Sequence, residues 1–373
     1  MARLTADQVR RWRARSQGLS GDGGTVADAV RSAAGLQAQD TKACRLQVRA
    51  RTGGLTAGRL DAACADRTVV RGWLMRGTLH AVAGTDLRWL TALLGPRTAD
   101  MYRGRRAKLG LDGELCGRAL TALERVLAGG PPRTRDEVVR GLAEEGVVLD
   151  PRGQAPAHLL VYAATRGLVC RGPEAAGDAA TYVLTEEWLA GVPDPGPTAD
   201  EALAELAVRH AASYGPVTAQ DFARWSGLPL GRARRGLAAA GDRIAEVPGP
   251  DGPLRIAAAA ESPPARAGAA TVRLTGHFDP YLLGYHDRDL LLAPAFARRI
   301  ATGGGFLMPS VLLDGAVVAT WRHTRRSDRS LTIRVESLTG PPTAELTAGV
   351  GAEVADIARF LGTSATWEWT AEL

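Results

Sequence analysis

Apolar residues recur at helical spacing through most of residues 1–240, whereas strand-like runs dominate beyond residue 270. Several helical segments open with a threonine that is followed three residues later by a Gln, Glu or Asp, which is the spacing of a capping box. These pairs are Thr5 with Gln8, Thr134 with Glu137, Thr198 with Glu201 and, with a shorter acid, Thr218 with Asp221. Each pair is predicted to begin a helical unit.

Residues 198–262 predict three helices followed by a hairpin. The helices are expected at 201–214, where a Gly-Pro step ends the first, at 218–226 and at 230–240. A strand, a Pro/Gly turn and a return strand follow in "RIAEVPGPDGPLRIAAA". This is the element order of a winged helix, and the third helix, which carries "GRARR", has the place of a groove-reading helix.

The two preceding segments repeat this order less regularly. Residues 131–197 predict helices at 134–145 and 155–166, and then two strands around "LVCRG" and "TYVLT". Residues 1–130 predict helices at 5–15, at 26–34 and near Leu60, before the strand-like "TVVRGWLMRGTLHAV". We therefore expect three tandem winged-helix motifs, at 1–130, 131–197 and 198–262.

The last segment, 263–373, predicts a small β-rich domain behind the Pro- and Ala-rich linker "ESPPARAGA" (261–269). Strands are expected in "TVRLTGHFDPYLLGY", "FLMPSVLLDGAVVATW" and "LTIRVESL", with a two-residue hairpin turn at Asp314-Gly315. A helix over 344–360 and an edge strand in "ATWEWT" complete the domain. The predicted fold class is α+β.

Length and composition narrow the class of protein. The chain has 373 residues, which is too long for one hydrophobic core, and its composition is that of an ordinary globular protein. No apolar run approaches a membrane span, and the N-terminal "MARLTADQVRRWRARSQ" lacks a signal-peptide core, so we expect a cytoplasmic, nucleoid-associated protein. The four cysteines lack zinc or disulfide spacing and are expected to be buried thiols.

The charge of +6 favours a polyanionic partner, most simply nucleic acid. Only two of the 46 basic residues are lysines, Lys42 and Lys108. A GC-rich genome also explains the arginine excess, since Ala and Gly are abundant too. Clustering separates the two explanations better, because "RTADMYRGRRAK", "GRARR" and "RHTRRSDR" contain almost no acid. Such runs indicate phosphate contact.

The stretch "GLQAQD" (35–40) contains two glutamines two positions apart. Side chains at this spacing diverge by about 200° in a helix but share a face in a strand. Gly35 is predicted to end the preceding helix, so Gln37 and Gln39 are expected to converge. Two amides can hold a water molecule but carry no titratable proton. Exposed loop glutamines remain the alternative from spacing alone.

Five motifs in register across nearly the whole chain resemble the winged-helix DNA glycosylases of the AlkZ and YcaQ group. They are "LQAQD", "RGWLMRGTLHAV", "YGPVTAQDFARWSGL", "FDPYLLGYHDRDLLL" and "PSVLLDGAVVATWR". That group carries Gln-x-Gln or Gln-x-Asp, and Gln37-Ala38-Gln39 is similar to the AlkZ branch. The resemblance implies excision of N7-alkylated guanines and of interstrand crosslinks made by azinomycin-type agents in antibiotic-producing actinomycetes.

The resemblance also implies a mechanism. An N7-alkylated guanine is cationic and leaves as a neutral base, so the enzyme needs to stabilise an oxocarbenium-like sugar and aim a water molecule at C1′. Gln37 and Gln39 take this role. Asp40 is a possible electrostatic helper, although a capping or solvated acid is the preferred reading of it. We expect a monomer without metal or cofactor that holds double-stranded DNA in a C-shaped channel.

Lysine scarcity bears on the type of glycosylase. A lyase activity needs an amine to form a Schiff base, and the chain offers Lys42, Lys108 and its N-terminus. Lys42 lies near the glutamines in sequence, so its role stays open. We predict a monofunctional, hydrolytic glycosylase.

Other candidate residues are expected to contact DNA. Arg76 and His80 alternate on a predicted hairpin, although a satisfied hairpin histidine explains His80 equally well. The 306–322 hairpin is expected to probe a DNA groove with its Asp314-Gly315 tip and the basic residues that follow it. The "GGG" at 303–305 is expected to be a hinge before that hairpin. The DNA-contact set is Arg45, Arg76, His80, Arg322, His323, Arg325 and Arg326.

Three competing readings stay open on the sequence. His277, Asp279 and His286 could form a metal site, which is disfavoured. A non-enzymatic winged-helix transcription regulator would need a dimer, for which no heptad is present. A metal-dependent nuclease would need a carboxylate cluster, which the sequence lacks.

Overall fold

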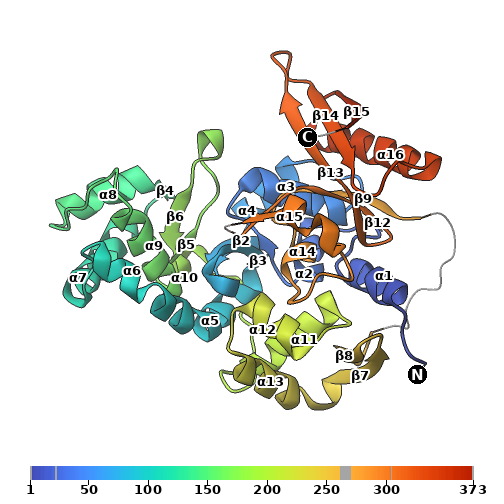
Figure 1. Ribbon diagram of the computed structural model, residues 1–373. Coiled ribbons are helices and arrows are strands. Elements are labelled where there is room, and N and C mark those ends of the chain that lie inside the picture. The colour runs from blue at the N-terminus through green and yellow to red at the C-terminus, as the bar shows by residue number, and fades with distance from the viewer. Residues whose placement is uncertain (1, 22, 261–269, 304, 372–373) are drawn as a thin grey trace. The chain divides into compact units, whose positions relative to one another are not determined.

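The computed structural model describes residues 2–21, 23–260, 270–303 and 305–371 (Figure 1). The chain has a mixed α+β fold and divides into two compact units. The first unit comprises Met1–Arg59, Ala204–Trp225 and Pro229–Leu373, and the second comprises Leu60–Leu203 and Ser226–Leu228. The predicted linker at 261–269 lies outside the described residues, and the four-segment division of the chain stays a prediction.

The second unit combines a small antiparallel sheet with helices. Its strands β3, β2, β5, β6 and β4 lie side by side in that order. Helices α7, α8 and α9 bury their apolar faces against β5 and β6 in one core that includes Leu123, Leu142, Leu159 and Tyr182. The elements in chain order are α4 (Gly58–Ala65), β2 (Val69–Trp73), η1 (Met75–Gly77), β3 (Leu79–Ala83), η2 (Gly84–Asp86), α5 (Leu87–Met101), α6 (Arg103–Lys108), α7 (Gly113–Leu127), β4 (Arg133–Thr134), α8 (Arg135–Glu144), α9 (Ala155–Thr165), β5 (Val169–Arg171), η3 (Ala176–Asp178), β6 (Thr181–Leu184) and α10 (Thr185–Trp188).

The first unit brings the two ends of the chain together. A five-stranded sheet, in the order β15-β14-β13-β12-β9, carries α16 on one face, and Leu46 of α3 joins their shared core. Its elements are α1 (Ala6–Ser16), α2 (Val26–Ser32), β1 (Leu36–Gln37), α3 (Thr41–Arg51), α11 (Ala202–Tyr214), α12 (Ala219–Ser226), α13 (Leu230–Ala239), η4 (Gly241–Arg243), β7 (Ile244–Gly249), β8 (Gly252–Ala257), β9 (Val272–Thr275), α14 (Pro280–Leu283), η5 (Pro294–Phe296), α15 (Ala297–Ile300), β10 (Ala301–Gly303), β11 (Phe306–Leu307), β12 (Ser310–Leu313), β13 (Ala316–Arg325), β14 (Leu331–Ser337), α16 (Ala344–Leu361) and β15 (Ala365–Thr370).

The predicted helix starts are confirmed. Thr5 and Thr134 each accept a hydrogen bond from the backbone three residues on, and the side chain at that position bonds back to the threonine. Glu201 accepts from the backbone N–H of Thr198, and Thr218 and Asp221 bond reciprocally. The three helices α11 to α13, followed by the β7–β8 hairpin, also have the predicted order. Their winged-helix packing stays a prediction.

The C-terminal elements follow the sequence prediction closely. The helix α16 ends where Gly362 adopts a left-handed conformation with φ 62°, and β15 lies at the edge of the sheet, parallel to β14. The Asp314-Gly315 turn is confirmed too, with φ values of 49° and 80° at its two residues. These positive angles are those of a two-residue hairpin turn.

One prediction near the sheet is wrong. The 306–322 segment is not one hairpin, because β11 pairs with β10 and only β12 and β13 flank the Asp314-Gly315 turn. Pro309, which has no amide hydrogen to give to a strand pairing, lies between β11 and β12. Gly303 ends β10 and pairs with Phe306 of β11, while Gly304 is outside the described residues, so the hinge at 303–305 stays a prediction.

Several helices were not predicted, and the longest of them are α3, α5 and α7. These three helices lack the threonine capping box by which other helix starts were found, since Asp40, Asp86 and Asp112 precede them. The four cysteines are buried and free, as predicted, and burial raises the pKa of the Cys170 thiol to about 12. Among the described residues no helix has both the length and the apolar character that crossing a membrane requires.

Close packing of α5 on α9 gives a direct test of the second unit. A Cβ added at Gly95 would collide with the Thr165 carbonyl, whereas a Cβ at Gly117 in α7 would meet nothing within 4 Å. We predict that Gly95→Ala lowers the free energy of unfolding by about 1 to 3 kcal/mol through overpacking. The matched control Gly117→Ala should raise it by about 0.5 to 1 kcal/mol, since alanine favours a helix. Equal urea midpoints for the two variants would contradict this packing.

Candidate active site

The end of α2 converts a helix into the short strand that carries the glutamine pair. Ala34 and Gly35 adopt positive φ values of 47° and 112°, and the Gly35 amide donates to the Val30 carbonyl at 2.9 Å. These left-handed conformations end the helix, and Leu36 and Gln37 then form the strand β1. The predicted role of Gly35 as the helix stop is confirmed.

Gln37 and Gln39 converge, as their spacing predicts. The Gln37 Nε2 donates to the Gln39 Oε1 at 3.1 Å. Gln37 is buried, with 7% of its surface exposed, whereas Gln39 is exposed. The pair therefore presents one fixed amide and one amide open to a ligand. The alternative of two unrelated loop glutamines does not describe this geometry.

Asp40 caps the helix that follows the pair. Its Oδ1 accepts the Ala43 amide at 3.0 Å and so satisfies one of the free donors at the start of α3. The preferred capping reading is confirmed, and a direct electrostatic role of Asp40 stays a prediction.

The side chain of Gln47, in the second half of α3, anchors the backbone of the glutamine pair. Its Nε2 lies 3.1 Å from the Gln37 carbonyl oxygen, 3.3 Å from that of His277 and 3.4 Å from that of Phe278. The side chain is completely buried. One amide nitrogen thus holds β1 beside the segment at 277–278, which comes from the other end of the chain.

A buried ion pair holds the segment that follows Phe278. Its arginine, Arg51, lies one helical turn after Gln47 in α3. Arg51 donates to both carboxylate oxygens of Asp279, at 2.8 and 2.9 Å, and the two side chains are 0% and 2% exposed. Arg51 also donates to the Gln17 Oε1 at 3.2 Å and to the Gln47 carbonyl. Asp279 in turn accepts the Tyr281 amide at the start of α14. A bidentate pair with these additional partners is the geometry in which burial of two charges is tolerated.

Rings and basic side chains surround this anchored backbone. The His277 and Phe278 rings both lie against Phe306 of β11, with centroids 4.9 and 5.0 Å away. Desolvation lowers the pKa of His323 on β13, and nearby His277, Arg325 and Lys42 lower it further. The charge of Lys42, which stands three residues after Gln39, therefore acts on His323.

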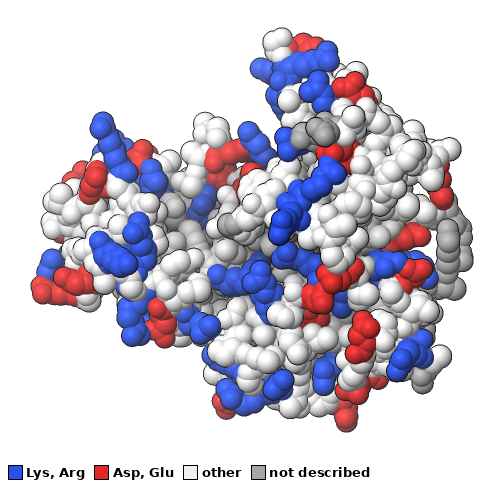
Figure 2. Space-filling view, in the orientation of Figure 1, with Lys and Arg blue, Asp and Glu red and all other residues white. Residues whose placement is uncertain are grey.

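The basic residues of β13 occupy the hairpin with β14. Arg322, His323, Arg325 and Arg326 are all exposed, and Lys and Arg side chains gather over the tip of this hairpin (Figure 2). The prediction that the Asp314-Gly315 turn forms the exposed tip beside these basic residues is wrong. The Asp314-Gly315 turn lies at the other end of β13, where a Cβ on Gly315 would be 2.6 Å from the Tyr281 hydroxyl and 2.9 Å from the Arg10 carbonyl oxygen. That turn is packed into the unit and cannot enter a groove.

The remaining predicted contacts fall into two groups. Arg45 lies half-buried on α3, two residues before Gln47. Arg76 and His80 belong to the second unit, where Arg76 has a φ of 56° in η1. His80 is 2% exposed, and its Nδ1 lies 2.9 Å from the Thr78 carbonyl oxygen. Burial, followed by the Arg76 charge, lowers the pKa of His80 to about 3, so the satisfied-histidine reading describes this residue.

The suggested metal ligands do not form one site. His277 Nδ1 lies 3.0 Å from the Leu307 carbonyl oxygen, Asp279 is engaged by Arg51, and His286 is exposed on a different cavity. Within the described ranges, no three His, Cys, Asp or Glu side chains group closely enough to hold a metal ion.

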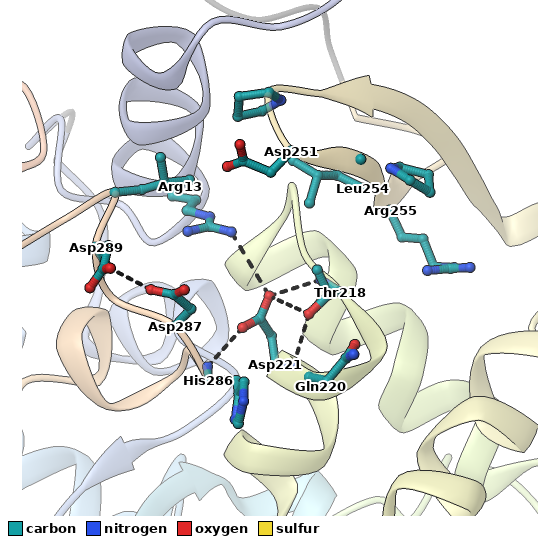
Figure 3. A pocket seen from close by; sticks show the side chains of 14 residues that line it. Arg13, Thr218, Gln220, Asp221, Asp251, Leu254, Arg255, His286, Asp287 and Asp289 are labelled. Atoms are coloured by element: carbon teal, nitrogen blue, oxygen red, sulfur yellow. Dashed lines mark hydrogen bonds and ion pairs between the residues drawn. The ribbon is translucent and has the colours of Figure 1, made fainter.

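That cavity, of about 560 Å³, lies in the first unit (Figure 3). Arg13 faces Asp221 across it, with 3.9 Å between their charged atoms, and Asp221 accepts the His286 amide at 2.8 Å. Its lining contains four aspartates against two arginines, a balance that disfavours phosphate. The charged lining residues are Arg13, Asp221, Asp251, Arg255, Asp287 and Asp289.

Sequence reasoning missed Gln47, Arg51 and Phe278. Nothing local distinguishes Gln47 or Arg51 from surface residues, because their partners stand more than two hundred positions away. For Asp279 a signal was present, since an aspartate followed by Pro and Tyr suggests a helix start.

Three comparisons with known proteins agree. Residues 30–360 match the model of the family described as DNA glycosylase AlkZ-like. The chain is 29% identical over 334 residues to an interstrand DNA cross-link repair glycosylase of Streptomyces sahachiroi, and the alignment covers 84% of this chain and 86% of the relative. The solved structure of the Streptomyces sahachiroi DNA glycosylase AlkZ superposes with a TM-score of 0.81 at 24% identity, covering 99% of this chain and 100% of that one.

The anchoring role of Gln47 can be tested by removing its donors while keeping its volume. We predict that Gln47→Met lowers the free energy of unfolding by about 1 to 3 kcal/mol, because buried carbonyl groups lose their partner. Gln220→Met, at an exposed position of α12, is the matched control and should change little. Urea denaturation measures both variants. If Gln47→Met unfolds with the stability of the control, the amide does not hold β1 in place.

Proposed function

Because the chain belongs to the AlkZ-like family of DNA glycosylases, we propose that it hydrolyses the N-glycosidic bond of N7-alkylated guanines in double-stranded DNA. The observation that carries this proposal is the hydrogen-bonded pair of Gln37 and Gln39, with one amide buried and one exposed. The pair gives an oriented donor and acceptor without an ionisable group.

The substrate supplies what the pair lacks. Alkylation at N7 gives the guanine a positive charge, so the bond from C1′ to N9 breaks with the electron pair leaving on a neutral base. A water molecule adds to C1′ of the electron-poor sugar and loses a proton to solvent. The amides then need only position that water and stabilise the sugar cation electrostatically.

The fixed position of Gln37 supports a role for the pair in stabilising the sugar cation. Preorganised dipoles stabilise charge well because they do not have to reorient when the charge develops. Gln37 is held through its own side-chain bond to Gln39 and through the bond from Gln47 to its backbone. Asp40, which caps α3, adds a negative charge near the pair. In this proposal, that charge contributes modestly to stabilising the sugar cation.

Bulky adducts and interstrand crosslinks belong to the proposed substrates. The relative from Streptomyces sahachiroi is named as a cross-link repair glycosylase, and the exposed Gln39 makes the pair accessible from outside. The exposed arginines of the β13–β14 hairpin would bind the phosphates of the duplex. We propose a monomer that acts on DNA in the cytoplasm, and a role in resistance to DNA-alkylating antibiotics.

The proposed reaction is hydrolysis without a covalent intermediate. Lys42 is the amine nearest in sequence to the pair, and its exposed ammonium group, whose charge acts on His323, suits a phosphate contact. In this proposal, Lys42 binds the DNA backbone and does not attack the sugar.

Release of 7-methylguanine from alkylated duplex DNA tests the proposal. Gln37→Ala and Gln39→Ala should each slow single-turnover release by about a hundredfold, the effect of removing one oriented polar group from a transition state. Gln220→Ala, at an exposed position, serves as the control and should release the base at the rate of the unaltered protein. Full rates in both site variants would show that the pair does not carry the reaction.

A further inference from the structure

A cluster of three rings lies beside the glutamine pair and has no part in the chemistry proposed above. Phe306 of β11 contacts the rings of His277 and Phe278, and Phe278 meets it edge to face at an interplanar angle of 83°. Gln47 connects this cluster to the pair, because its Nε2 lies within hydrogen-bond distance of the backbone oxygens of Gln37, His277 and Phe278.

Phe306 is unusual in its exposure. The exposed large apolar side chains of the described chain are Met101, Val148 and Phe306, and only Phe306 belongs to the first unit. Its side chain is 40% exposed although two rings pack against it. The exposed part of the ring is therefore free to stack on a flat ligand group such as a nucleobase.

The backbone at Phe278 is held in an unfavourable conformation. Its φ is 56°, in the left-handed region that a phenylalanine rarely occupies. The Gln47 amide on one side and the Arg51–Asp279 ion pair on the other keep it there. Strain that the surroundings maintain in this way is typical of functional positions.

The charges around the rings select the partner. His277, Arg325 and Lys42 each lower the pKa of His323, so the groups that act on this histidine are themselves basic. A second protein surface that covered the rings would need to match several cations. A nucleic acid matches them directly, since it offers phosphates to the cations and flat base faces to the rings.

We propose that Phe306, supported by His277 and Phe278, stacks on a nucleobase adjacent to or opposite the lesion. This inference rests on the proposed function, because it takes damaged duplex DNA as the substrate. Stacking of this kind holds the duplex open at the lesion and keeps C1′ in line with the glutamine pair. It needs no hydrogen bond to the base and therefore tolerates any neighbouring sequence.

A double-mutant cycle between protein and DNA tests the contact. The probe is a duplex in which a tetrahydrofuran residue replaces the lesion nucleotide. Three further duplexes also lack one base, on the 5′ side, on the 3′ side or opposite. We predict that removal of one of these bases weakens binding of the unaltered protein by about fivefold or more. Phe306→Leu should already bind weakly and should lose less than about twofold on the same duplex.

Two further variants and one stability measurement serve as controls for the stacking contact. Phe306→Trp retains a ring and should restore the sensitivity to the missing base. Phe296→Leu changes a half-buried phenylalanine of the same unit outside the ring cluster and should behave like the unaltered protein. Thermal unfolding of Phe306→Leu should match that of the control, because the substituted ring is partly exposed.

The outcomes separate this inference from the proposed function. Additive losses on all three duplexes, or unchanged binding by Phe306→Leu, overturn the stacking contact. A shift from dimer to monomer on Phe306→Leu in sedimentation also overturns it, since the rings then serve self-association. Failure of the unaltered protein to release 7-methylguanine overturns the proposed function instead, because the binding probe carries no base at the lesion.

Discussion

The glutamine pair depends on the attachment of α3 to a segment more than two hundred residues away. Arg51 and Asp279 form a bidentate ion pair that is almost completely removed from solvent, and Gln47 adds hydrogen bonds from the same helix. Loss of one partner of such a pair leaves an uncompensated buried charge, which typically costs about 3 to 5 kcal/mol. A second buried arginine of α3, Arg49, donates through its Nη1 to one carboxylate oxygen of Glu353 in α16, at 2.9 Å. The C-terminal sheet and helix therefore act as the support on which β1 is held.

Local signals in the sequence predicted much of this architecture. Capping boxes located the starts of α1, α8, α11 and α12, and the Asp-Gly turn and Gly362 located the ends of C-terminal elements. The spacing of Gln37 and Gln39 behind Gly35 predicted their convergence. These features depend on residues a few positions apart, so one sequence suffices to find them.

Long-range pairing explains what the sequence did not reveal. Arg49 and Arg51 look like surface arginines of a basic protein, yet both are buried because their acids arrive from distant segments. The sequence also failed to show which end of β13 is exposed, for the same reason. Its Asp314-Gly315 turn looks like an exposed tip in sequence, but Tyr281 and Arg10 pack against it. The ring cluster likewise joins residues from two segments, and no periodic pattern connects them.

The proposed chemistry follows from the chemical character of these groups. The two glutamines are neutral, and one of them, Gln37, is buried and held in place. Under the proposal, the positive charge of the alkylated base drives its departure, so no histidine near the pair has to move a proton. In this proposal, basic side chains on β13 and α3 bind the phosphates, and the rings stack on the bases. Recognition of the duplex and cleavage of the bond are thus assigned to different side chains of one unit.

The pH dependence of single-turnover 7-methylguanine release tests this account most directly. With neutral amides as the reacting groups, the rate constant should vary by less than about twofold between roughly pH 6 and pH 9, where neither amide titrates. A tenfold change that follows a single ionisation near neutrality would contradict it, because a general acid or base would then carry the step.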